Sequence, residues 1–137
     1  MTLSALRVDA LRAADGATEV RLSLPWIRSL PLASLLDPIV HLDGARHEPS
    51  VALGARRVPA AALADEDGWW YLQDRVVLEI PHAVSPGIHE VSVSFRLEIP
   101  YLPGGPDQPL RLPFSFTRDL EAGSAVTSVS LDVGSAA

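Results

Sequence analysis

The stretch Val91-Ser92-Val93-Ser94-Phe95-Arg96-Leu97-Glu98-Ile99 decides the fold class, because apolar and polar residues alternate along it without a break. A period of two places the apolar side chains on one face of a β-strand and the polar side chains on the other. This strand predicts a sheet that is buried on one face and solvated on the other. Sheets of that kind are typical of antiparallel architectures.

Similar alternation recurs along the chain. Further strands are predicted over Leu6–Ala10, Val20–Leu24, Ile39–Leu42, Val76–Ile80 and Leu110–Phe116. Turn signals separate these runs, namely Asp15-Gly16, Asp43-Gly44, Asp67-Gly68, Pro86-Gly87 and Pro103-Gly104-Gly105-Pro106. We therefore expect an all-β fold, an antiparallel β-sandwich of about eight short strands with long proline-rich loops.

Two details refine this expectation. Pro113 lies on the outer row of its strand and cannot donate a backbone hydrogen bond, which indicates an edge strand or a bulge. Helical signal is weak, and only Ala60–Ala64 and Leu32–Leu36 are predicted to form single turns.

The 137 residues suit one domain, which we place at residues 1–117. Residues 118–137 are predicted to be a C-terminal extension. Its alternating residues Val129, Leu131 and Val133 favour a last strand, in this domain or against a partner, and its final four residues are expected to fray.

Composition excludes several functions. The chain has no cysteine, which removes disulfides and thiolate chemistry and fits a cytoplasmic location. Its net charge is −6, its basic residues are all scattered arginines, and no basic patch indicates binding to nucleic acid or to an anionic membrane surface. No signal peptide and no membrane-spanning segment is predicted.

No catalytic or metal-binding constellation is found. The histidines (His41, His47, His82 and His89) lack the His-X-His spacing of a metal pair on one strand, so we interpret them as structural. No nucleophile elbow, phosphate loop or dinucleotide motif is present. We predict no catalytic residue, no metal ligand and no cofactor in this chain.

An apolar segment is the main candidate for a functional surface. It follows a strand that its two prolines cannot continue, and it comprises Pro25, Trp26, Ile27, Arg28, Ser29, Leu30, Pro31 and Leu32. A loop this apolar either packs on its own domain or is covered by a partner. A second such passage contains Tyr101, and the pair favours an interface or a substrate-pocket loop. Arg28 either binds a carboxylate or satisfies loop carbonyls.

The aromatic run Trp69-Trp70-Tyr71 is a second candidate. On a strand, Trp69 and Tyr71 point one way and Trp70 the other. Flat rings stack on the apolar face of a sugar, so these residues are candidates for sugar or aglycone contact. The alternative is that one face fills the core and the other covers an edge or an interface.

Several motifs together resemble one known family. They are Leu6-Arg7-Val8 to Asp15-Gly16, Leu24-Pro25-Trp26-Ile27-Arg28-Ser29-Leu30-Pro31-Leu32, Leu42-Asp43-Gly44, Trp69 to Leu72, Gly87-Ile88-His89 and Leu97-Glu98-Ile99-Pro100-Tyr101-Leu102. With them the chain resembles the β subunit of bacterial C-glycoside deglycosidases, a family of small β-sandwich proteins. The resemblance covers nearly the whole chain up to Phe116, and its most specific part is the Pro25–Pro31 run.

The resemblance implies a partner, a larger α subunit with a TIM barrel and a divalent metal, typically manganese. That subunit cleaves the carbon–carbon bond of 3-keto C-glycosides such as oxidised flavonoid glycosides, and the small subunit docks beside the barrel mouth and helps complete the site. We therefore expect a non-catalytic β subunit of a lyase complex, inactive alone. The alternatives are a free-standing carbohydrate-binding module and, less favoured, a self-contained β-barrel enzyme.

Overall fold

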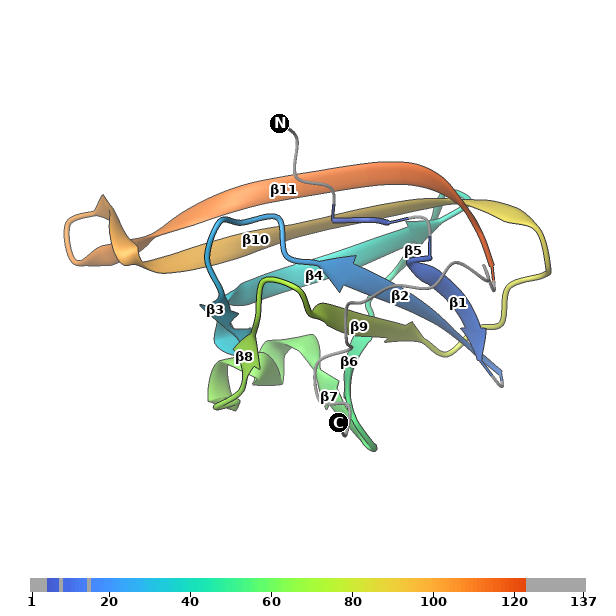
Figure 1. Ribbon diagram of the computed structural model, residues 1–137, viewed down its shortest axis with the longest axis horizontal. Coiled ribbons are helices and arrows are strands. Elements are labelled where there is room, and N and C mark those ends of the chain that lie inside the picture. The colour runs from blue at the N-terminus through green and yellow to red at the C-terminus, as the bar shows by residue number, and fades with distance from the viewer. Residues whose placement is uncertain (1–4, 8, 15, 123–137) are drawn as a thin grey trace.

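A computed structural model describes residues 5–7, 9–14 and 16–122. It contains two antiparallel sheets that pack face to face (Figure 1). The first sheet has the spatial order β1 (Leu11–Ala14), β2 (Ala17–Ser23), β9 (Arg75–Ile80), β6 (Ser50–Leu53) and β7 (Arg56–Pro59). The second has the order β11 (Gln108–Glu121), β10 (Ile88–Gly105), β4 (Leu35–Leu42) and β5 (Ala45–His47). The predicted all-β sandwich is confirmed.

A two-stranded ribbon closes one end of the sandwich. It consists of β3 (Leu30–Pro31) and β8 (Trp69–Trp70), which pair antiparallel. Two short 3-10 turns, η1 (Leu32–Ser34) and η2 (Ala60–Asp65), lie beside it and match the two predicted helical turns. None of the described helical segments is long and apolar enough to cross a membrane.

The core follows from the alternation in β10. Val91, Val93, Phe95, Leu97 and Ile99 are buried between the sheets, whereas the intervening residues stay at least partly exposed. Opposite them, the equivalent rows of β2 and β9 are fully buried. The inner row of β11 is only half-buried, because β11 is the outermost described strand of its sheet. This position agrees with the edge strand that Pro113 predicts.

The first predicted strand is wrong. β1 begins at Leu11, and the residues before it form a turn in which the Ala10 N–H donates to the Arg7 carbonyl at 3.0 Å. The turn brings Asp9 to the buried Arg75 guanidinium, 2.8 Å away. Asp9 and Arg75 are both nearly inaccessible, and on either side of Asp9 the Ala5 and Ala10 carbonyls accept backbone hydrogen bonds from Ser23 and Arg21 of β2.

Two strands are longer than expected, and the strands are more numerous. The described residues form eleven strands where about eight were predicted, and β10 and β11 have 18 and 14 residues. β11 runs to Glu121, so residues 118–121 continue the sheet beyond the boundary placed at 117. The strand predicted around Val129–Val133 lies outside the described residues.

The ends of β10 and β11 form an arm, defined as residues 99–112. β4 pairs with β10 only as far as Leu97, so beyond that point the two strands pair only with each other. Figure 1 shows the arm extending past the other strands, at the end of the molecule where β3 and β8 lie. Gly104 allows the two backbones to approach closely, because a Cβ there would lie 2.5 Å from the Pro109 carbonyl oxygen.

Candidate functional site

The predicted apolar segment 25–32 lies at the arm end of the sandwich. Pro25 and Leu30 are buried, whereas Ile27 and Arg28 are exposed. Leu30 pairs with Trp70 in the β3–β8 ribbon, and the Ser29 hydroxyl accepts a hydrogen bond from the Leu72 N–H at 3.0 Å. The segment is therefore fixed to the second candidate region, residues 69–72, by backbone pairing and by a side-chain bond.

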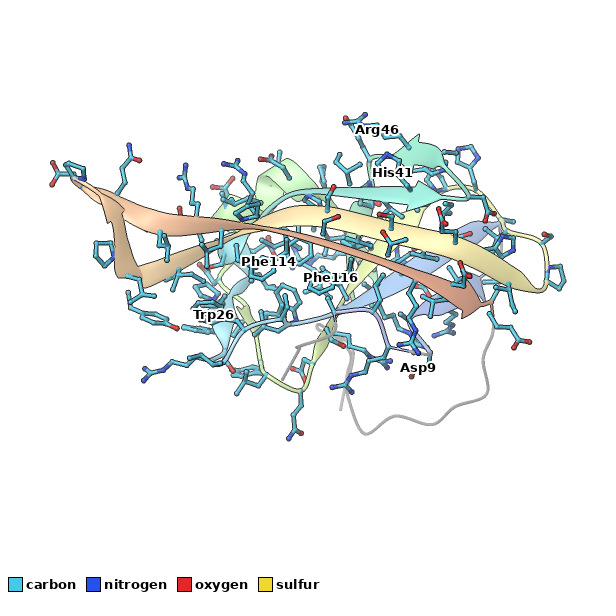
Figure 2. The ribbon with its side chains drawn as sticks, turned by 90° about the horizontal axis from the view of Figure 1, so that it is seen from above. Asp9, Trp26, His41, Arg46, Phe114 and Phe116 are labelled. Atoms are coloured by element: carbon cyan, nitrogen blue, oxygen red, sulfur yellow. The ribbon has the colours of Figure 1, made fainter. Side chains whose placement is uncertain are left out.

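Tyr101 of the arm joins the same site. The Trp26 indole Nε1–H donates to the Tyr101 hydroxyl oxygen at 2.6 Å. The Arg28 guanidinium carbon lies 5.5 Å from the centre of the Tyr101 ring, within the range of a cation–π contact. Three regions that are distant in sequence thus converge, as a shared interface or pocket requires. Figure 2 shows Trp26 on the same side of the β10–β11 layer as Phe114 and Phe116, opposite His41 and Arg46.

These regions form an exposed apolar surface, which we call the end patch. Of the seven large hydrophobic residues exposed in the described chain, six belong to it and only Ile88 lies elsewhere. The end patch consists of Ile27, Trp69, Tyr71, Leu72, Tyr101 and Leu102. Its concentration at one end differs from the scattered exposure of single apolar residues that is normal on monomers. Such a surface indicates an interaction site.

The two adjacent tryptophans have opposite environments, as their alternation predicts. Trp69 is 48% exposed, whereas Trp70 is 0% exposed and its Nε1–H donates to the Asp74 carbonyl at 3.0 Å. The Trp70 ring therefore belongs to the core and is not accessible to a sugar or an aglycone. Leu30 and Pro25 likewise support the segment from within, and Ile27, Arg28, Trp69, Tyr71 and Tyr101 are the accessible candidates.

A groove of about 580 Å³ lies beside Trp69. It is lined by Leu32, Leu53, Arg56, Asp65, Glu66, Asp67, Gly68 and Trp69. Arg56 and Glu66 form a 2.7 Å ion pair at this groove, and hydrogen bonding to Glu66 raises the pKa of Arg56. The combination of an exposed indole with charged groups resembles a shallow sugar-binding surface. The sequence predicts only a turn at Asp67-Gly68, and nothing in it indicates that Arg56 approaches the acidic residues beside that turn.

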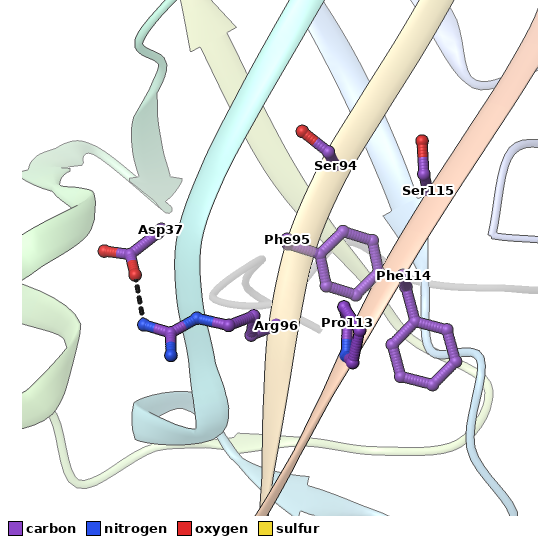
Figure 3. A pocket seen from close by; sticks show the side chains of 7 residues that line it. All are labelled: Asp37, Ser94, Phe95, Arg96, Pro113, Phe114 and Ser115. Atoms are coloured by element: carbon purple, nitrogen blue, oxygen red, sulfur yellow. Dashed lines mark hydrogen bonds and ion pairs between the residues drawn. The ribbon is translucent and has the colours of Figure 1, made fainter.

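A second depression, of about 430 Å³, lies on the outer face of the other sheet (Figure 3). It is lined by Asp37, Ser94, Phe95, Arg96, Pro113, Phe114 and Ser115. Asp37 has a positive φ of 50°, where the β4–β10 register shifts, and its carboxylate pairs with Arg96. The ion pair holds this irregular position in the strand. Because the carboxylate is engaged by a guanidinium, the depression offers no poised general base.

His89 is the histidine with the most distinctive surroundings. Its Nδ1 lies 2.6 Å from an Asp43 carboxylate oxygen and its Nε2 lies 2.7 Å from the Ser85 carbonyl oxygen. Both oxygens are acceptors, so the arrangement favours the protonated ring, in which both nitrogens donate. The hydrogen bond to Asp43 and then that to Ser85 raise the pKa of His89, and the same contact lowers the pKa of Asp43. A doubly protonated ring has no free nitrogen with which to act as a base.

The remaining histidines do not assemble a site. The rings of His47 and His82 lie 5.4 Å apart, and His41 lies on the outer face of its sheet. In the part of the chain that the structure describes, no group of three or more His, Asp or Glu side chains is placed to hold a metal ion. The contact of Asp43 with His89 is an addition to the turn role that the sequence predicts for Asp43.

Comparison with known proteins identifies two relatives. The chain is 33% identical over 100 residues to a 3'-dehydrocarminate deglycosidase beta subunit from a Microbacterium species, an alignment that covers 69% of this chain and 76% of the relative. It is 32% identical over 126 residues to the C-glycoside deglycosidase beta subunit of Microbacterium trichothecenolyticum, covering 88% and 92% of the two chains. No protein-family model matches the chain.

Proposed function

Because the chain belongs to the family of C-glycoside deglycosidase beta subunits, we propose that it is the small subunit of a deglycosidase complex and supplies no catalytic group. The observation that carries the proposal is the end patch, where six of the seven exposed large hydrophobic side chains of the described chain gather. Such a surface suits contact with another protein better than it suits bond cleavage.

We propose that the partner is a metal-dependent TIM-barrel subunit, with manganese as the expected ion, acting on a 3-keto C-glycoside. The name of one relative contains 3'-dehydrocarminate, which describes an oxidised glycoside. A ketone at C3 acidifies the C–H at C2, so a base can remove that proton. The C1–aglycone bond then breaks, a double bond forms between C1 and C2, and the aglycone takes up a proton. Base and metal both belong to the partner in this scheme.

The geometry of the end patch supports a docking role. Trp26 holds Tyr101 through a 2.6 Å hydrogen bond, and Ser29 holds the 69–72 region through the Leu72 N–H. Prolines at positions 25 and 31 further restrict the backbone. A surface that is ordered before binding loses less conformational entropy when a partner covers it. The same end of the molecule is proposed to border the substrate pocket of the complex.

The test is reconstitution. The purified chain alone is expected to release no aglycone from a 3-keto C-glycoside, and co-expression with the α subunit is expected to give activity measured by chromatography of the aglycone. Ile27→Asp is expected to abolish co-purification. Ile88→Asp is its matched control, because Ile27 and Ile88 are 71% and 72% exposed and only Ile27 is in the end patch. Full activity of the α subunit without this chain, or equal effects of the two variants, would contradict the proposal.

Trp26→Ala tests the end patch by changing a residue that holds one of its members, Tyr101, in place. It removes the hydrogen bond to Tyr101 without emptying the main core, since Trp26 is only partly buried. We expect a larger loss in complex formation or turnover than in thermal stability. A collapse of the melting temperature with normal assembly of the remaining folded protein would assign this segment to the core.

A second candidate function, carbohydrate binding by the isolated chain, is favoured by the groove beside Trp69. Its exposed indole and its Arg56–Glu66 pair are the groups that commonly stack on a pyranose and bind its hydroxyls. Titration calorimetry of the chain with mono- and oligosaccharides decides between the candidates. Tight binding that is lost in Trp69→Ala would establish the module, and absence of heat at millimolar sugar would exclude it.

A further inference from the structure

Arg28 differs from the other arginines in what it contacts. At least eight of the eleven arginines have a carboxylate oxygen within 4.0 Å: Arg12, Arg21, Arg46, Arg56, Arg57, Arg75, Arg96 and Arg111. Arg7 is also engaged in a contact. Arg118 instead donates to the Leu6 carbonyl. Among the residues that the structure describes, none offers a carboxylate to Arg28 within that distance, although acidic residues outnumber arginines 17 to 11.

The position of Arg28 makes this difference informative. Its guanidinium lies over the Tyr101 ring, and the Tyr101 hydroxyl is held by Trp26. A guanidinium above a ring keeps its N–H donors at its edges, where they remain free for an acceptor. Arg28 is therefore a cation that the chain orients within the end patch, next to Ile27 in the sequence and over the Tyr101 ring.

Covering the end patch would remove water from this cation. A guanidinium that loses water without gaining an acceptor is strongly unfavourable, so a partner that fits the patch must supply one. A carboxylate matches the fork of guanidinium donors with two parallel hydrogen bonds. Because this chain has a net charge of −6, it does not attract acidic groups at long range, so the attraction between Arg28 and a partner carboxylate must act at short range.

We infer that Arg28 is the ionic anchor of the partner interface. The surface that docks on the end patch is an apolar protein surface of the larger subunit, and it carries one Asp or Glu carboxylate opposite Arg28. This inference rests on the proposed function, because it takes the larger subunit as the occupant of the end patch. It goes further by assigning one polar contact and the chemistry of the surface that makes it.

The experiment measures dissociation of the co-purified complex. In the first measurement, each variant (Arg28→Gln, Arg28→Lys or Arg28→Glu) competes with a labelled unmodified chain for the α subunit, which gives its relative affinity. In the second, mass photometry measures the fraction of intact complex after dilution. Arg28→Gln is expected to weaken binding about 30-fold or more, as for loss of one member of a covered charge pair, mainly through faster dissociation. Arg28→Lys is expected to lose less, and Arg28→Glu the most. Circular dichroism checks that each variant remains folded.

Arg96→Gln is the matched control. Arg96 is also an exposed arginine, but it pairs with Asp37 on the outer face of the sheet (Figure 3) and is not an end-patch residue. It is expected to change binding less than 3-fold. In a second step, single Asp→Arg and Glu→Arg changes in the α subunit are paired with Arg28→Glu, and one of them is expected to restore binding through the reversed charge pair.

The outcomes separate this inference from the proposed function. Failure of the unmodified chain to bind the α subunit would overturn both. Normal binding of Arg28→Gln in a complex that Ile27→Asp disrupts would overturn only the charge pair. An unchanged dissociation constant with a raised KM would show that Arg28 contacts substrate, which also overturns the pairing with a partner carboxylate.

Discussion

Replacing Trp70 and Trp69 in turn tests the separation between core and interaction surface. The two residues are adjacent and chemically identical, yet one is fully buried and the other is 48% exposed. Trp70→Ala removes the largest buried side chain and its hydrogen bond to the Asp74 carbonyl. Truncation of a buried tryptophan costs about 3–5 kcal/mol, and a lost hydrogen bond adds to this. Trp69→Ala is expected to cost less than about 1 kcal/mol, as surface substitutions do.

These magnitudes matter because a domain of this size has a total stability of about 5–15 kcal/mol. Trp70→Ala therefore removes a large share of it, whereas Trp69→Ala leaves the protein folded. Urea unfolding followed by far-ultraviolet circular dichroism measures both. Trp70→Phe, which keeps an aromatic ring in the cavity, is expected to lie between them and keeps the comparison measurable if Trp70→Ala does not fold.

In a binding assay, the substitution at Trp69 is expected to have the larger effect, which is the reverse of the order expected for stability. Among folded molecules, Trp69→Ala is expected to weaken association with the α subunit, and Trp70→Phe is expected to retain it. Equal losses of stability in Trp69→Ala and Trp70→Ala would refute the assignment of opposite environments. Normal association of Trp69→Ala would remove Trp69 from the partner surface while leaving the fold argument intact.

Three further predictions concern other parts of the chain. Asp9→Ala removes the carboxylate that the buried Arg75 contacts at 2.8 Å, and chemical denaturation should show a loss of about 3 kcal/mol or more; a loss below 1 kcal/mol would contradict the role of this pair. His89→Gln should lower the free energy of unfolding by its full amount below the unfolded histidine pKa near 6.5, and this difference from the unmodified chain should disappear as pH rises through the raised pKa of His89. In acid the difference should also shrink as pH falls through the lowered pKa of Asp43. A difference that grows above pH 7 would be inconsistent with the pair. Gly104→Ala should displace the arm, because the added Cβ would lie 2.5 Å from the Pro109 carbonyl oxygen. We expect weaker partner binding with a small change in melting temperature. Unchanged binding would show that the arm is not part of the interface.

Strands with strict alternation were predictable, and those without it were not. In β10 the alternation of burial predicted for Val91–Ile99 is confirmed residue by residue, because a strand that is buried on one face has apolar residues on that face and polar residues on the other. β6 was missed because Val51, Ala52 and Leu53 are all buried, so no period of two is visible. The strand expected at residues 6–10 was wrong because the chain turns there, with Ala10 bonded to Arg7 and Asp9 paired to Arg75, and local alternation does not reveal either contact.

The candidate site, too, could be predicted only in part from the sequence. Apolar loops rich in proline could be recognised as unusual from composition alone. Their convergence could not, because Trp26 and Tyr101 are 75 positions apart and their hydrogen bond depends on how far the arm reaches. The opposite fates of Trp69 and Trp70 followed from strand geometry. The distance of Arg28 from the described carboxylates could not be predicted either, because it depends on the tertiary packing of residues that are far apart in sequence.

β11 also bears on how the protein behaves when it is concentrated. No other described strand pairs with its outer edge, and an unpaired strand edge is a template on which further chains can polymerise. Pro109 and Pro113 interrupt that template, since neither can donate a backbone hydrogen bond to an added strand. Filament growth by edge-to-edge addition is thereby opposed at two points along the strand. The exposed apolar residues of the end patch lie outside β11, so a contact through them is made by side chains and does not extend the sheet.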